Sequence, residues 1–393
     1  MAISTKVNEC VKGASWIRKM FEEGAALREQ YGADQVFDFT LGNPTIEPPA
    51  ELHEELKQIA NNPVPGMHRY MNNAGFDETR AAVAEVIAEN CTQPVTGNHV
   101  VMTCGAGAAL NVVLKTLLNP GDEVIILTPF FVEYKFYIDN HQGIPVTVAT
   151  DDNFQPDLKA IGCAISERTK AIIINSPNNP TGVIYPEETL KALGVLLKEK
   201  EQHFGTSITA ISDEPYAKIS YGEEVPCIFN CVENAVIVTS HSKDLALPGE
   251  RIGYLAANPA MTDVALFMQG AIFCNRVLGF VNAPALMQRL VTKLQHSSVD
   301  SEIYRRKRDL LYDKLTALGF EMIKPGGGFY LFPKSPLTDE MEFIRLAQKY
   351  CILLVPGSGF GVPGYFRIAY CVDDEMIERS LPRWEELAKE VGL

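Results

Sequence analysis

Lys243 and Arg251 are the first residues whose placement suggests chemistry. They lie eight positions apart in SHSKDLALPGERIGY (240–254), which directly follows the apolar, β-branched run AVIVTS (235–240). Such a run predicts a buried strand. Placing a lysine at the end of a buried strand removes part of its charge from water, which is unfavourable. A lysine at such a position therefore suggests a function. A surface loop with two ordinary cations would give the same pattern, so the other strand ends have to decide.

Four more apolar runs are each followed by residues suited to binding a ligand. HVVMT (99–103) leads into CGAGAAL, EVIILT (123–128) into PFFVEY, KAIIINS (170–176) into PNNPTG, and SITAISD (207–213) into EPY. Helical patterns such as PEETLKALGVLLKEKEQHF (186–204) separate the runs. This alternation predicts an α/β fold whose mostly parallel sheet is covered by helices. Ligands bind such sheets at the carboxyl ends of the strands, so these segments are expected to meet at one site.

The pattern changes near residue 290, where a long helix is expected over about 290–318, followed by short strand-like stretches. We therefore expect two domains. Residues 46–288 would form the large, ligand-binding domain with the sheet. Residues 1–45 and 289–393 would form a smaller α+β domain.

The composition of the chain argues against several classes of binding partner. The chain has 393 residues and a formal net charge of −14, which argues against nucleic acid because phosphate binding needs clustered Lys and Arg. No run of 18 apolar residues and no signal-peptide pattern is seen, so a cytoplasmic protein without a membrane span is expected. The nine scattered cysteines form neither a disulfide framework nor a zinc motif, so no metal is expected.

One ligand would use all the groups at the strand ends. The small residues at a helix start suit an anion, and the aromatics suit a flat ring. The ligand would also have to use an amide, an acid, a phenol, a lysine and an arginine. Pyridoxal 5′-phosphate is a flat, phosphorylated heteroaromatic aldehyde that needs an amine and an acid beside its ring nitrogen. Taken singly, each segment also fits a structural role: close helix packing, a hydrophobic core or a tight turn.

On these motifs the sequence resembles the class I/II aminotransferases, which are fold-type-I enzymes of the aspartate aminotransferase superfamily. The motifs are SHSK with GERIGY, NNPTG, DEPY and the late arginine of FRIAY, and the resemblance runs from LGNPTIEPP (41–49) to FRIAYC (366–371). It implies a large pyridoxal-phosphate-binding domain, a smaller α+β domain, and a homodimer with shared active sites.

The resemblance also implies a role for each matching residue. Lys243 would form the Schiff base with the cofactor and transfer a proton, and Asp213 would pair with the ring nitrogen. Tyr216 and Asn179 would hydrogen-bond the ring 3-oxygen. The residues expected to hold the phosphate or stack on the ring are Gly105, Ala106, Gly107, Ser240, Arg251 and Phe131. His241 is assigned no chemistry, and the Asn179–Pro180 peptide is expected to be cis.

For the substrate, the resemblance implies that Arg367 takes the α-carboxylate with help from Gly42 and Asn179. Tyr70 would reach the phosphate of the neighbouring subunit, although it could instead be a buried aromatic. Arg276 lies near the position from which one branch of the family lends an arginine to a distal carboxylate, although it could be a surface arginine. A second branch uses a lysine where this chain has Gly107.

The sequence therefore predicts a transaminase that works by a ping-pong route. An L-amino acid, with aspartate narrowly favoured, would give its amine to a 2-oxo acid such as 2-oxoglutarate. A β-lyase or decarboxylase on the same fold is the nearest alternative, together with an aminotransferase for neutral or aromatic amino acids. A cofactor-binding regulator and a nicotinamide dehydrogenase fit less well, because neither an added DNA-binding module nor a full glycine fingerprint is present.

Overall fold

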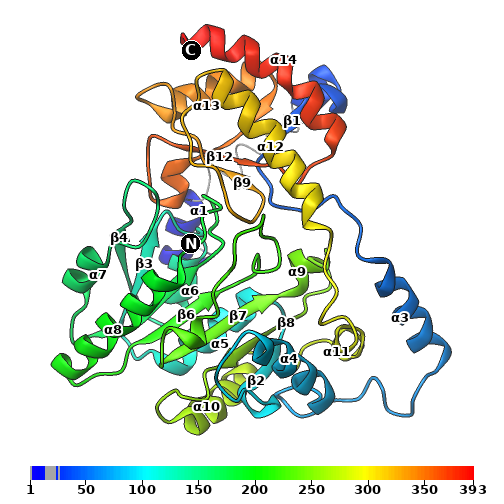
Figure 1. Ribbon diagram of the computed structural model, residues 1–393, viewed down its shortest axis with the longest axis vertical. Coiled ribbons are helices and arrows are strands. Elements are labelled where there is room, and N and C mark those ends of the chain that lie inside the picture. The colour runs from blue at the N-terminus through cyan, green and yellow to red at the C-terminus, as the bar shows by residue number, and fades with distance from the viewer. Residues whose placement is uncertain (1, 14–23, 25–26) are drawn as a thin grey trace. The chain divides into compact units, whose positions relative to one another are not determined.

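The chain forms two compact units in a computed structural model that describes residues 2–13, 24 and 27–393 (Figure 1). Unit 1 contains the described residues of Met1–Thr45 together with Tyr304–Lys324 and Phe329–Leu393. Unit 2 contains Ile46–Ile303 and Pro325–Gly328. The amphipathic start of the sequence is helical over α1 (Thr5–Gly13), and residues 14–23 lie outside the described part of the chain.

The sheet of unit 2 has seven strands in the order β2-β8-β7-β6-β5-β3-β4. Its strands are β2 (Val100–Thr103), β3 (Glu123–Thr128), β4 (Ile144–Ala149), β5 (Thr169–Asn175), β6 (Thr209–Asp213), β7 (Ala235–Ser240) and β8 (Gly253–Ala257). β8 runs antiparallel to both of its neighbours, and the other pairs are parallel. The predicted α/β fold with a mostly parallel sheet is thereby confirmed.

Every apolar run predicted as a strand of this sheet is a strand, and two strands of the sheet, β4 and β8, were not predicted. β4 is an edge strand with several exposed residues, so its sequence IPVTVA lacks a continuous apolar signal. β8 has the sequence GYLAA, in which glycine and alanine replace the β-branched residues that usually mark a strand.

Both faces of this sheet are covered, which explains why its central strands are apolar throughout. Alternate residues such as Ile126, Ile173 and Val238 join one core cluster with residues of α5 and α10. The residues between them, such as Ile125 and Ile172, are also fully buried. A parallel sheet buried on both sides needs this composition because each strand contributes side chains to two cores.

Helices precede, connect and follow the strands of unit 2. They are α3 (Ala50–Asn61), α4 (Asp77–Glu89), α5 (Ala106–Leu117), α6 (Tyr134–Asn140), α7 (Leu158–Ala164), α8 (Glu187–Phe204), α9 (His241–Asp244), α10 (Val264–Val277) and α11 (Ala285–Thr292), with the 3-10 turns η2 (Gly97–His99) and η3 (Ile228–Asn230). α8 matches the helix predicted over 186–204.

The prediction of one long helix over about 290–318 is wrong. The chain instead forms α11, a connecting segment, and α12 (Ser301–Ala317). Asp300 accepts a hydrogen bond from the backbone N–H of Glu302 at 3.0 Å, a capping contact that starts a new helix. Residues 289–303, which the sequence analysis assigned to the smaller domain, group with unit 2 because α11 packs against α3 and α4.

The described part of unit 1 contains two small sheets and several helices. β1 (Phe37–Asp38) pairs with β10 (Ile352–Leu353), while β11 (Val355–Pro356), β12 (Phe366–Ala369) and β9 (Tyr330–Leu331) form an antiparallel sheet. Its described residues also form α1, η1 (Ala33–Gln35), α12, α13 (Glu340–Lys349), η4 (Gly357–Phe360) and α14 (Asp374–Val391). The rings of Phe320, Phe343, Phe366 and Trp384 contact one another in its core.

No helix in the described part of the chain could cross a membrane. The longest described helices, α8 and α14, have 18 residues each and carry charged residues along their length. Charged residues at this density are incompatible with a lipid-spanning segment.

Replacing Gly194 by alanine should destabilise the protein. Gly194 lies in α8, and a Cβ added there would come within 2.1 Å of the backbone oxygen of Cys231, beside η3. Backbone cannot move aside cheaply, so overpacking should cost about 1–3 kcal/mol. Thermal unfolding of Gly194→Ala should therefore start at a lower temperature than that of the wild type. Val195→Ala, at a 60% exposed position of the same helix, is the matched control and should change little. Equal unfolding temperatures for all three proteins would contradict the packing argument.

Candidate active site

Apart from Tyr70 and Arg276, the predicted site residues of unit 2 lie along one edge of the seven-stranded sheet. β5, β6 and β7 are parallel and end at Asn175, Asp213 and Ser240. β8 is antiparallel and starts at this same edge, where Gly253 is paired with Ser240 on one side and with Thr103, the last residue of β2, on the other. The edge therefore collects the ends of these strands and the first residue of β8.

The expected phosphate cradle forms where backbone segments approach closely. Gly105 precedes α5 with a φ of +87°, a conformation that favours glycine. A Cβ on Gly105 would lie 2.9 Å from Nη2 of Arg251, and one on Gly253 would lie 2.9 Å from the Cα of Ser240. Arg251, Ser240 and the helix start Gly105–Ala106–Gly107 are thus brought together. An N-terminal helix end beside a guanidinium group suits a phosphate.

The Arg251 side chain is held by backbone carbonyl groups. Its Nη1 donates to the oxygen of Pro248 at 2.9 Å and its Nη2 to the oxygen of Cys104 at 3.3 Å. Arg251 itself has a φ of +52°, in the left-handed region that non-glycine residues seldom adopt. Such a conformation persists only where the surrounding contacts determine it. The turn thus fixes the guanidinium group against the start of α5.

Asp213 is buried at the end of β6 with one satisfied carboxylate oxygen. Its Oδ2 accepts a hydrogen bond from the Tyr134 hydroxyl at 2.5 Å, whereas Oδ1 has no hydrogen-bond partner among the described residues. Burial raises the pKa of Asp213 to about 7, although the hydrogen bond from Tyr134 lowers it. A buried carboxylate oxygen of this kind suits a cationic N–H donor.

The sequence analysis missed two tyrosines at this edge. Tyr134 and Tyr137 belong to α6, which follows the predicted stacking residue Phe131. The Tyr134 ring lies edge-on to Phe131 with 5.6 Å between centroids. A Cβ on Gly107 would lie 3.0 Å from the Tyr137 hydroxyl, and burial, reinforced by Glu133 and Asp213, raises the pKa of Tyr137 to about 12. The two tyrosines are three residues apart in FVEYKFY, a spacing that places both on one face of a helix and could have identified them.

Asn175, which the sequence analysis did not assign, ties the predicted NNPTG turn to the end of β6. Its Nδ2 donates to the backbone oxygen of Asp213 at 2.8 Å, and its Oδ1 accepts from the backbone N–H of Asn179 at 2.7 Å. Asn179 and Tyr216 are both buried at this edge. The predicted cis peptide between Asn179 and Pro180 is confirmed.

Lys243 lies on α9, a helix of four residues that directly follows β7. The side chain is half-buried, and its neighbours His241, Ser242 and Asp244 are buried. The lysine is therefore carried at the carboxyl end of a buried strand, as the sequence predicted.

The expected substrate-binding residues Arg367 and Gly42 belong to unit 1. Arg367 is buried on β12, with its guanidinium group 4.6 Å from the ring centre of Tyr330 and 4.8 Å from that of Phe360. Its Nη2 donates to the backbone oxygen of Thr40 at 2.6 Å. A Cβ on Gly42 would lie within 2.0 Å of the Tyr330 hydroxyl, so Gly42 allows the ring that stacks on Arg367 to approach.

Tyr70 and Arg276 are both exposed. Tyr70 is 89% exposed, so the alternative that it is a buried aromatic is wrong. Arg276 is exposed in the last turn of α10, with its guanidinium group 5.5 Å from the ring centre of Phe273. Exposure fits both an ordinary surface residue and one that contacts a second subunit.

The groups at the sheet edge fit pyridoxal 5′-phosphate. The close approach of Gly105, Arg251 and Gly253 forms a cradle that a side chain at either glycine would fill. Asp213 presents a buried acceptor oxygen, and Lys243 supplies a primary amine. Phosphate, ring nitrogen and aldehyde would thus each have a counterpart in unit 2.

Comparison with known proteins gives the same picture. The family model described as "Aminotransferase class I and II" matches residues 34–383. The aspartate/prephenate aminotransferase of Thermus thermophilus is 34% identical over 91% of this chain and 92% of its own length. The aspartate aminotransferase of Thermotoga maritima is 30% identical over 90% of this chain and 91% of its own.

Solved structures agree over the same span. The crystal structure of an amino transferase from Eubacterium rectale has a TM-score of 0.96 and 37% identity, covering 100% of both chains. The Thermus thermophilus aspartate aminotransferase solved with maleate has a TM-score of 0.83 and 30% identity, covering 94% of this chain and 95% of the other.

Asp213→Asn should stabilise the cofactor-free protein at alkaline pH. A carboxyl pKa of about 7 in the folded state, against about 3.9 when unfolded, means that the wild type loses stability progressively as the pH rises from about 4 to about 7, and that the loss is complete above pH 7. Asparagine does not ionise, so the variant should gain up to about 4 kcal/mol over wild type at pH 8, from three pKa units at 1.36 kcal/mol each, and much less near pH 4. Urea unfolding at both pH values measures this difference. The exposed Asp152→Asn is the control and should show no such pH dependence. A gap between Asp213→Asn and wild type that does not change with pH would contradict the assignment.

Proposed function

Because the chain belongs to the class I and II aminotransferases, we propose that it moves the amino group of an L-amino acid, aspartate-type substrates being favoured, to a 2-oxo acid such as 2-oxoglutarate by a ping-pong route. It is a transaminase that uses pyridoxal 5′-phosphate. The observation that carries the proposal is the meeting of Asp213, Lys243 and Arg251 at one edge of the sheet.

Lys243 is proposed to anchor the cofactor and to move the proton. When bound, pyridoxal phosphate supplies an aldehyde that condenses with amines and a protonated ring that accepts electrons from the substrate's α-carbon. With the cofactor bound, the ε-amine of Lys243 would accept the proton from the substrate's α-carbon and would donate it at C4′ of the cofactor. Lysine suits this task because its flexible stem can reach both positions.

Asp213 and its neighbours are proposed to keep the cofactor ring cationic. An ionised carboxylate beside the ring nitrogen favours the protonated ring, and the cation in turn lowers the raised pKa of Asp213. Tyr134 donates to Oδ2 and so leaves Oδ1 for the ring nitrogen. Tyr216 and Asn179 would donate to the ring 3-oxygen, and Phe131 would stack on the ring.

The phosphate and the substrate are proposed to bind through two arginines. Arg251, Ser240 and the backbone of Gly105–Ala106–Gly107 would hold the phosphate, with unit 2 as the cofactor-binding domain. Arg367 would take the substrate α-carboxylate as a bidentate pair, since stacking on Tyr330 and Phe360 fixes the plane of its guanidinium group. Gly42 and Asn179 would assist at that carboxylate.

A homodimer with shared active sites is proposed to complete the site. The exposed Tyr70 would contact the phosphate of the neighbouring subunit, and Arg276 a distal carboxylate. Relatives named aspartate/prephenate aminotransferase, and a related structure solved with maleate, point to dicarboxylate substrates. Neutral or aromatic amino acids, and β-lyase or decarboxylase chemistry, are the alternatives. We place the enzyme in the cytoplasm.

A substrate panel tests this function directly. The purified enzyme would be given aspartate, glutamate, alanine and aromatic amino acids with either 2-oxoglutarate or pyruvate as acceptor. Transfer to 2-oxoglutarate, fastest from a dicarboxylate, supports the proposal. Release of ammonia, pyruvate or carbon dioxide without a new amino acid would favour a lyase or decarboxylase.

Lys243→Ala should abolish transamination without unfolding the protein. The variant loses both the anchoring amine and the group that moves the proton, while the contacts of Arg251 and Asp213 remain. It should therefore retain some cofactor non-covalently, keep its thermal unfolding temperature, and lose its turnover. Turnover within tenfold of wild type would show that Lys243 has another role. Lys200→Ala on α8 serves as a control for lysine removal and should stay active.

Arg276→Ala should discriminate between substrates. If the arginine pairs with a distal carboxylate, its loss should cost at least about 2 kcal/mol of transition-state binding, which is about thirtyfold in kcat/KM for aspartate. Alanine, which has no distal carboxylate, should be used as well as before. Arg345→Ala at an exposed position of α13 is the control. Equal effects on aspartate and alanine would end the proposed role of Arg276.

A further inference from the structure

Lys243 sits on a helix too short to hold its own shape. α9 has only four residues. An isolated helix of that length is not stable in water, because the entropy lost in fixing its backbone exceeds the stabilisation from the hydrogen bonds of a single turn. Its geometry must therefore come from contacts with the rest of unit 2. Those contacts determine where the backbone of Lys243 lies, and hence the point from which its amine reaches out.

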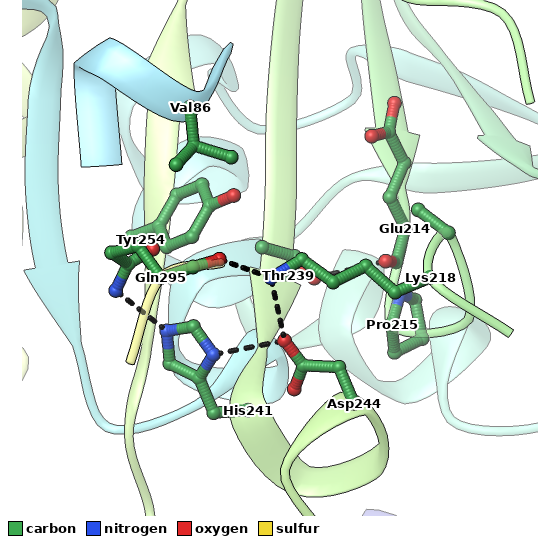
Figure 2. A pocket seen from close by; sticks show the side chains of 10 residues that line it. Val86, Glu214, Pro215, Lys218, Thr239, His241, Asp244, Tyr254 and Gln295 are labelled. Atoms are coloured by element: carbon green, nitrogen blue, oxygen red, sulfur yellow. Dashed lines mark hydrogen bonds and ion pairs between the residues drawn. The ribbon is translucent and has the colours of Figure 1, made fainter. Parts of the chain in front are cut away.

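Two residues of α9, His241 and Asp244, belong to a buried polar network (Figure 2). His241 Nδ1 lies 3.1 Å from Asp244 Oδ2, and the other ring nitrogen, Nε2, lies 3.4 Å from Nε2 of Gln295. The Gln295 amide also donates to the backbone oxygen of Val291 at 2.9 Å, which fixes its NH₂ group toward His241. An NH₂ group only donates, so His241 Nε2 accepts and Nδ1 carries the proton given to Asp244.

Asp244 is the centre of this network. Lys218 Nζ lies 3.6 Å from Asp244 Oδ2, and Asp244 Oδ1 accepts from the backbone N–H of Leu245 at 2.9 Å. The backbone oxygen of Asp244 accepts from Val299 N–H at 2.6 Å. Burial raises the pKa of Asp244, but its contacts with His241 and Lys218 more than offset this and leave the pKa below its ordinary value. The carboxylate is therefore ionised and fully engaged.

The network is attached to the segment that follows α11. Lys218 Nζ donates to the backbone oxygen of Gln295 at 2.5 Å and to that of Ser297 at 3.4 Å. Gln295 is itself buried. α9 is thus tied on one side to Lys218, which follows β6, and on the other to residues 295–299, which lead into α12.

The helix geometry separates this network from the lysine. His241 and Asp244 are three residues apart and share one face of α9, whereas Lys243 projects from a different face. The cavity beside the network has a volume of about 50 Å³, enough for a few water molecules but too small for an amino acid. The network therefore does not bind substrate itself.

We propose that His241 and Gln295, acting through Asp244, form a clamp that positions Lys243 for proton transfer. This role rests on the proposed function of Lys243. His241 touches neither substrate nor cofactor in this role; it is a positioning residue. An arrangement of three buried polar side chains is an expensive way to fill space when apolar residues could do so, which fits a requirement for fixed geometry.

Hydrogen–deuterium exchange on the full chain, with and without the cofactor, tests the clamp. In His241→Ala, the amides of residues 241–247 should exchange at least tenfold faster, while those of β5 stay unchanged. In the loaded enzyme, kcat should fall at least tenfold with KM within threefold of wild type, because misplacing a reacting group slows the chemical step rather than binding. His241→Asn keeps an N–H donor near the Nδ1 position and should restore most of the protection and the activity.

The matched variants keep the test decisive. Gln295→Leu removes the outer half of the clamp and should accelerate exchange in 241–247, which carries the test if His241→Ala does not fold. His296→Ala changes the adjacent histidine, whose side chain is 69% exposed, and should behave as wild type. Wild-type exchange in both His241→Ala and Gln295→Leu would overturn the proposal, as would acceleration spread equally over β5. The cofactor-free exchange data stand even if Lys243 proves not to anchor the cofactor, so the two failures can be told apart.

Discussion

The candidate active site depends on keeping the Asp213 carboxylate inside the protein, although this destabilises the cofactor-free fold. Burial at the end of β6 raises its pKa to about 7, so ionising it in the cofactor-free chain is unfavourable. The protein compensates only in part, through one hydrogen bond from Tyr134 to Oδ2. A cationic N–H at Oδ1 would complete the set. Cofactor binding and folding stability are therefore linked, since a group that binds only the folded state stabilises it.

The direction of one strand explains why a lysine and an arginine eight residues apart serve the same site. β8 runs antiparallel to β7, so it must begin at the edge where β7 ends. The whole connection of residues 241–252 consequently stays at that edge, with Lys243 near its start and Arg251 near its end. A parallel β8 would have required the chain to cross to the opposite edge before returning. The positive φ of Arg251 and the glycine at 253 are the local conditions that let this connection close onto the start of α5.

Sequence reasoning located the strand ends but not the helices that complete the site. Apolar runs mark buried strands, and the polar residues directly after them were found because chain position alone assigns them to the edge. Tyr134 and Tyr137 escaped because only the formation of α6 turns them toward Asp213 and Gly107. The break between α11 and α12 escaped because Asp300 acts through a capping hydrogen bond rather than through hydrophobic periodicity. His241 was set aside since its partner Gln295 lies more than 50 residues away, and such contacts leave no local signal.

Asp213 and Asp244 show how the same residue type is used in two opposite ways. Both are buried, with Asp213 5% and Asp244 7% exposed. Asp244 follows Lys243 directly in the chain, and Asp213 ends β6, the strand paired with β7, which leads to Lys243. Yet burial raises the pKa of Asp213, while the pKa of Asp244 is lowered despite burial. The difference lies in their partners: Asp244 has His241, Lys218 and a backbone N–H, whereas Asp213 has Tyr134 alone for its side chain among the described residues. A carboxylate whose partners are all supplied by the chain stabilises the fold by itself. One whose partners are incomplete contributes its full interaction only when a ligand brings the missing donor.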